Sequence, residues 1–153
     1  MGKILYKETQ KFNQWWLWLI VISLFLIPIL QFNWSEDLLG QFTTDKIIPS
    51  ILPVVILVLF LTLKMTTVIT EDKITVRYIP FVRKEFNWSE LSFAQVIDYG
   101  FIGGWGIRFW TSYGTVYNVR GSKGLHIKTA SNQYVIGTQK EKELRSTIEH
   151  LLK

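Results

Sequence analysis

Two long apolar stretches near the start of the chain constrain its fold more than any other feature. The first covers residues 15–30 (WWLWLIVISLFLIPIL) and the second residues 47–63 (IIPSILPVVILVLFLTL). A bilayer core of ~30 Å requires about 20 helical residues, and flanking residues extend the two predicted helices to 13–32 and 47–64. A chain of 153 residues cannot build a water-facing shell around helices that are apolar on every side. Residues 15–64 are therefore predicted to form a transmembrane hairpin.

The charges that flank these stretches predict the orientation of the hairpin. Residues 1–14 carry three lysines and one acidic residue, whereas residues 31–46 carry three acidic residues and one lysine. Because positively charged segments stay in the cytoplasm, we expect residues 1–14 to be a cytoplasmic juxtamembrane lead-in and residues 31–46 an external loop. The expected location is the cell membrane, multi-pass, with both termini cytoplasmic. The net charge of +5 then reflects topology and attraction to anionic lipid.

The rest of the chain, residues 65–153, is predicted to form one all-β domain. Short alternating or β-branched segments between turn residues predict strands at 66–70, 73–78, 82–86, 91–99, 106–111, 115–119, 124–129 and 133–137. Short strands at such close and regular spacing are typical of a sandwich or a small barrel.

A C-terminal amphipathic helix is predicted at residues 139–152, where it would close the β domain. Thr138 and Glu141 have the spacing of a capping box. One face of the helix is apolar and carries Leu144, Ile148, Leu151 and Leu152. A helix of this kind covers an open sheet edge.

At this point the chain resembles a known family. The segments that carry the resemblance are residues 6–12 (YKETQKF), 103–108 (GGWGIR), 121–124 (GSKG) and 136–139 (IGTQ). Together with the order of strands and one closing helix, they resemble small bacterial membrane proteins that have two transmembrane helices and a cytoplasmic pleckstrin-homology-like (PH-like) domain. The resemblance implies a PH-like module at the membrane surface. It does not extend to phosphoinositide binding, because the first hairpin of the domain has two acidic residues at its tip, Glu71 and Asp72.

The sequence favours no enzymatic activity, cofactor or metal. It contains no cysteine, which excludes thiol chemistry and cysteine zinc sites. Its two histidines, His126 and His150, lack neighbours at metal-ligand spacing; His126 is expected to face solvent beside Lys128. No basic stripe interleaved with aromatic residues indicates nucleic acid.

Two loops are candidate contact sites, each with a structural alternative. Phe101, Ile102 and Trp105 lie in a glycine-rich loop that is either a tight bend or an apolar tip touching lipid or a partner. Arg120 and Lys123 flank a turn that is either solvated or a small anion-binding nest. Arg108 lies in an apolar strand, and the sequence leaves open whether it faces solvent or is paired internally.

Two functions follow from these features. The first is a non-enzymatic membrane protein whose PH-like module binds a protein partner or a second copy of itself. The alternative is binding or sensing of anionic lipid headgroups through the basic turn and the apolar loop. Salt dependence distinguishes the two, because lipid binding through Arg120 and Lys123 weakens as salt rises.

Overall fold

The computed structural model describes residues 2–32 and 43–151. The chain divides into two compact units: a helical unit of residues 13–63, and a β unit of residues 1–12 and 64–153.

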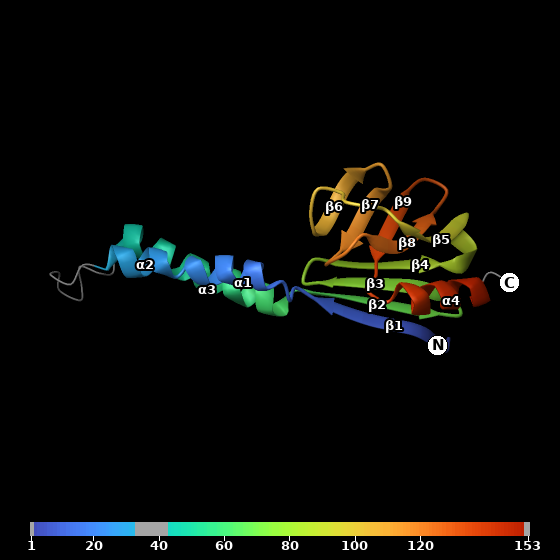
Figure 1. The fold of residues 1–153 in the computed structure, drawn as a ribbon, viewed down its shortest axis with the longest axis horizontal. Coiled ribbons are helices and arrows are strands. Elements are labelled where there is room, and N and C mark those ends of the chain that lie inside the picture. The colour runs from blue at the N-terminus through green and yellow to red at the C-terminus, as the bar shows by residue number, and fades with distance from the viewer. Residues whose placement is uncertain (1, 33–42, 152–153) are drawn as a thin grey trace. The chain divides into compact units, whose positions relative to one another are not determined.

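The described residues of the helical unit form three α-helices: α1 (Trp15–Ser23), α2 (Leu26–Gln31) and α3 (Thr44–Thr62). Both α1 and α2 contact α3 (Figure 1). The single helix expected at residues 13–32 is instead interrupted at Leu24 and Phe25. Pro28 explains the interruption, since proline has no N–H to donate and its ring clashes with the carbonyl four residues earlier.

One helix of the described residues, α3, is long and apolar enough to cross a membrane by length and composition, and only 6% of its most apolar window is buried. The segment Trp15–Gln31 is apolar but shorter. The helix α3 begins three residues before the predicted residue 47, so it includes the end of the expected external loop. Residues 33–42 of that loop lie outside the described residues.

The first sheet of the β unit has four antiparallel strands in the order β1-β2-β3-β4. Their bounds are β1 Ile4–Lys11, β2 Lys64–Thr70, β3 Lys73–Ile79 and β4 Val82–Asn87. The strand β1 lies within the segment expected to be only a lead-in. Its buried positions include Glu8 and Gln10, so the apolar alternation that marks a strand is missing from its sequence.

The second sheet has five strands in the order β5-β8-β9-β7-β6. Their bounds are β5 Phe93–Asp98, β6 Gly106–Thr111, β7 Gly114–Asn118, β8 Lys123–Lys128 and β9 Gln133–Gly137. The pair β7–β9 is parallel, whereas the other pairs are antiparallel. A short 3₁₀ helix, η2 (Trp88–Glu90), connects β4 to β5. The strands β2 to β9 therefore overlap the eight predicted segments.

The core of the β unit includes contacts from one sheet to the other. The ring of Phe86 on β4 lies 4.9 Å from that of Tyr134 on β9. The hydroxyl of Tyr78 on β3 donates to the carbonyl of Asn118 on β7, at 3.4 Å, and burial raises the pKa of Tyr78 to about 12. In Figure 1 the strands of the five-stranded sheet run across those of the four-stranded sheet.

The C-terminal helix α4 (Glu141–Leu151) contacts β1 of one sheet and β5 and β8 of the other. Leu144 and Ile148 are buried, so the predicted apolar face is confirmed for these two residues. Leu152 lies outside the described residues. The predicted capping box does not form, because the N–H of Thr138 donates to the Lys123 carbonyl at 2.8 Å and Glu141 binds Lys123 and Arg145.

A buried polar cluster joins β1 to the start of α4. The Glu8 carboxylate accepts hydrogen bonds from the Tyr6 hydroxyl at 2.5 Å, the Thr138 hydroxyl at 2.7 Å and the Gln139 N–H at 2.8 Å. Burial, and then the bond to Glu8, raise the pKa of Tyr6. Glu8 itself is only 5% exposed, so this carboxylate links chain segments far apart in sequence within the core.

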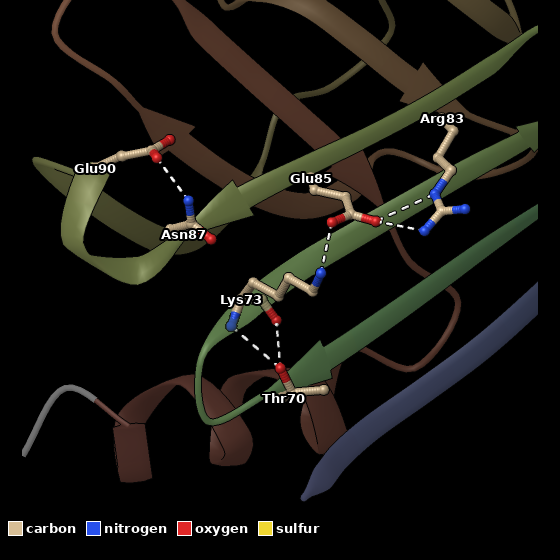
Figure 2. Close-up of polar contacts among 6 residues, drawn as sticks. All are labelled: Thr70, Lys73, Arg83, Glu85, Asn87 and Glu90. Carbon is tan, nitrogen blue, oxygen red and sulfur yellow. Dashed lines mark hydrogen bonds and ion pairs between the residues drawn. The ribbon is translucent and has the colours of Figure 1, made fainter. Parts of the chain in front are cut away.

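Charged residues on the four-stranded sheet pair with one another in solvent (Figure 2). Glu85 accepts hydrogen bonds from Lys73 at 2.5 Å and Arg83 at 2.7 Å. The bond from Lys73 contributes most and that from Arg83 next, and together they lower the pKa of Glu85 to about 2. The Thr70 hydroxyl bonds both the N–H and the carbonyl of Lys73 at 3.1 Å. This face of the sheet is thus polar and internally paired.

Candidate binding cleft

A cleft of about 590 Å³ lies at one end of the five-stranded sheet, between the loop that follows β5 and the β6–β7 hairpin. The side chains around it are mostly aromatic or apolar, with one cation. They include Tyr99, Phe101, Ile102, Arg108, Trp110 and Tyr113. The strand β6 is the last strand of its sheet. The cleft therefore combines exposed aromatic rings with a sheet edge, a frequent site of protein contacts.

A hydrophobic cluster supports the base of the cleft. Tyr99, Val116 and Val135 are its buried members, and Ile102 and Tyr113 pack against them. The Tyr99 hydroxyl accepts a hydrogen bond from the Asn118 side chain at 3.1 Å and donates to the Gly121 carbonyl at 3.3 Å. The base is therefore held by both packing and hydrogen bonds. Ile102, predicted to be part of an exposed tip, belongs to this support.

His126 lies near the base and does not face solvent as expected. It is buried, and its Nε2 lies 3.1 Å from Oε1 of Gln133. The rings of Phe93 and Tyr113 meet it edge-on, at 5.4 and 5.5 Å. Burial lowers the pKa of His126, which favours the neutral ring. Its role is packing beneath the cleft.

The glycine-rich loop brings its backbone close to Arg108. Gly104 has φ +131°, a conformation that residues with a Cβ rarely adopt, and a Cβ there would collide with the Arg108 guanidinium. Glycine at this position therefore makes room for the arginine. The same loop carries Phe101, which is 83% exposed, and Trp105 at its end, which is also exposed.

The β6–β7 hairpin places two aromatic side chains in solvent. Trp110 has φ +56° and is 96% exposed. The strand register is irregular between Arg108 and Thr111, which marks a bulge. The Phe109 ring, also exposed, lies 5.9 Å from that of Trp110. A left-handed conformation at a bulky residue costs free energy, so the arrangement at Trp110 is unfavourable in the free protein.

Arg108 follows neither of the alternatives that the sequence left open. Its side chain is half-buried rather than fully solvated. Its Nε atom is buried and has no hydrogen-bond partner among the residues that the structure describes. The Nε–H group has therefore lost water without gaining an acceptor.

The basic turn is placed elsewhere. Neither Arg120 nor Lys123 is among the residues that line the cleft. The ammonium of Lys123 lies 2.6 Å from the Glu141 carboxylate, which raises the pKa of Lys123. Arg120 is exposed, and its carbonyl accepts a hydrogen bond from the Gln139 side chain. The acidic neighbour of Lys123 makes this turn less attractive to an anion than its sequence indicates.

Of the five predicted contact residues, Phe101 and Ile102 line the cleft and Trp105 lies close to them in sequence. Phe109 and Trp110 were missed, although the sequence held a signal for them. Two large aromatic residues in succession on a strand point to opposite faces, so one of them is expected to lack cover when only one face is packed.

The chain matches no known protein-family model, no curated protein and no solved structure. Within residues 2–32 and 43–151, no three His, Cys, Asp or Glu side chains form a group that could hold a metal ion.

Proposed function

We propose that this chain is a non-enzymatic integral membrane protein that presents a β module for binding a protein partner. The helical unit is the anchor: α3 is apolar and its side chains are hardly buried, so they require lipid or another protein to cover them. The helices α1 and α2 lie beside α3 and together form the other arm of a hairpin. That arm is interrupted because it contains Pro28. Irregular backbone is tolerated in membranes where neighbouring helices cover it.

The charge asymmetry supports an arrangement with both termini in the cytoplasm. An impermeant thiol reagent should label a cysteine placed at Gln41 in intact cells, and not one at Ser131; the reverse pattern contradicts this topology. The PH-like resemblance stays part of the proposal. The consecutive order of β1 to β4 and the closing helix support it, whereas the parallel β7–β9 pair departs from consecutive antiparallel strands.

The observation that carries the binding function is the exposure of Trp110 in a left-handed conformation beside a cleft lined largely by aromatic side chains. Both the exposed ring and the backbone conformation are unfavourable in the free protein. Such strain is often found at sites of recognition, where a bound partner offsets it. Trp is also among the residues that contribute most to protein interfaces.

Site-specific photo-crosslinking in native membranes tests this proposal. A photoreactive amino acid at position 110 should yield discrete protein adducts. The matched control is position 84, because Lys84 is exposed on the other sheet, and it should yield none of the same adducts. Adducts to lipid alone at position 110 favour the alternative function, headgroup binding, and identical patterns at the two positions contradict a specific partner site.

Binding of anionic lipid through the basic turn has less support. The Lys123–Glu141 ion pair neutralises one of its two cations. The exposed Phe101 and Trp105 favour contact with a bilayer only if they face it.

A further inference from the structure

The cleft holds a cation that lacks a counterpart. Arg108 lines the cleft with its Nε buried and unbonded, and no described residue forms an ion pair with it. A buried N–H group without an acceptor is unfavourable. The natural complement of a guanidinium is a carboxylate, which accepts two parallel hydrogen bonds from it.

Several side chains around Arg108 are aromatic or aliphatic. Phe101 and Trp110 stand exposed at the rim, and Tyr99 with Ile102 forms the base. A volume of about 590 Å³ is within the range of ligand sites, which is roughly 300–1,000 Å³. Such a cleft has room for a few side chains, so an occupant that satisfies the arginine also has to cover aromatic surface.

The geometry points to a specific occupant: an extended protein segment in which an acidic side chain is flanked by apolar or aromatic side chains. The carboxylate pairs with Arg108, and the flanking groups cover Phe101 and Trp110. This inference rests on the proposed function and names the chemistry of its partner.

The distribution of charge favours a protein carboxylate over a phosphate headgroup. Among the described residues, Arg108 is the one charged side chain that lines the cleft, which matches a single negative charge. Phosphate sites commonly gather several cations or a row of N–H donors. The cations of the basic turn do not supply them, because Arg120 and Lys123 lie outside the lining and Lys123 is already paired with Glu141.

The test is selection of peptides on the full chain held in phosphatidylcholine nanodiscs. A phage-displayed random heptapeptide library should yield binders with Asp or Glu between apolar residues. In the best synthetic peptide, replacing the acid by its amide should weaken binding at least about tenfold, as expected for a lost charged hydrogen bond. When the chain carries Arg108→Gln, replacing the acid of the peptide by its amide should change binding less than about twofold, because the variant has no guanidinium for the acid to pair with.

Two variants serve as controls. Arg77→Gln, which removes an exposed arginine from β3 of the other sheet, should bind as the wild type does. Arg108→Lys, which keeps the charge without the planar fork, should retain part of the preference for the acid. Equal thermal midpoints for wild type and variants show that each remains folded.

Three results overturn the inference: no enriched peptide, enrichment without an acidic residue, or equal acid preference on wild type and Arg108→Gln. Displacement of the peptide by phosphatidylglycerol vesicles but not by phosphatidylcholine vesicles assigns the cleft to a lipid headgroup instead. Protein adducts at position 110 without an acid preference overturn this inference alone. If the selected peptides prefer an acid but position 110 forms no protein adducts in native membranes, the proposed function is overturned.

Discussion

Glu8 and Arg108 are charged residues of the same β unit that differ in their hydrogen-bond partners. Glu8 is buried and accepts three hydrogen bonds, from Tyr6, Thr138 and Gln139. Arg108 has a buried Nε with no partner among the described residues. The first arrangement is complete within the chain, so it explains stability. The second is incomplete, and its place beside exposed aromatic rings indicates that its counterpart comes from another molecule.

The largest effect is expected from Glu8→Leu. The substitution leaves the Gln139 N–H without its acceptor. The Tyr6 hydroxyl keeps only the Thr138 hydroxyl, at 2.9 Å, and the Thr138 hydroxyl loses its acceptor but still accepts from the Lys140 N–H. Unsatisfied groups of this kind cost about 1–3 kcal/mol each, so we expect a loss of roughly 3 kcal/mol and a thermal midpoint lower by roughly 10 °C or more. Thermal unfolding followed by circular dichroism measures it.

Glu85→Leu is the matched control, since it removes an acid of the same sheet from solvent-exposed ion pairs. Exposed pairs contribute little, so its midpoint should stay close to that of the wild type. Equal losses for the two variants would show that the Glu8 cluster is no more important than a surface pair.

The strands β2 to β9 and the helix α4 could be predicted because their apolar residues recur at the spacing of the element. The strand β1 could not, since its core-facing residues include Glu8 and Gln10. Their burial depends on partners more than a hundred residues away in sequence, Thr138 and Gly137, and no local pattern reveals these contacts. The sequence thus predicts an element when its core residues are apolar, and fails when the core is polar.

The site was predicted in part for a similar reason. The glycines around Phe101 and Trp105 indicated an irregular loop, and an exposed apolar tip followed from it. The cleft also needs the bulge that exposes Trp110 and the close approach of Gly104 to Arg108. Both are set by strand register, because β6 pairs with β7 on one side and ends its sheet on the other. The sequence could therefore place Arg108 in a strand without deciding what surrounds it.

A smaller effect, of opposite sign, is expected at the rim of the cleft. Trp110→Gly removes a left-handed conformation at a bulky residue, which should raise the free energy of unfolding by about 1 kcal/mol. Trp110→Ala removes the same ring but keeps a Cβ, so most of the backbone strain remains. Both variants should lose the partner adducts formed through the cleft.

Chemical denaturation and crosslinking from a neighbouring rim position, Phe101, measure the two properties separately. A stabilised Gly variant and an unchanged Ala variant, both deficient in binding, show that the strain serves recognition. If Trp110→Gly instead unfolds more readily than Trp110→Ala, the ring supports the fold and the comparison with Glu8 loses its basis.

The smallest effect on stability is expected from Arg108→Met, and it is the closest counterpart of Glu8→Leu. Methionine retains an unbranched apolar stem, fits irregular spaces and carries no N–H group that needs an acceptor. Replacing an uncompensated charge by an apolar side chain is neutral or stabilising, so the midpoint in urea should be unchanged or raised, by less than about 1 kcal/mol in free energy. Selection of acidic peptides should be lost at the same time. A destabilisation comparable to that of Glu8→Leu would mean that Arg108 already has its partner within the chain, and the cleft would then need no carboxylate from outside.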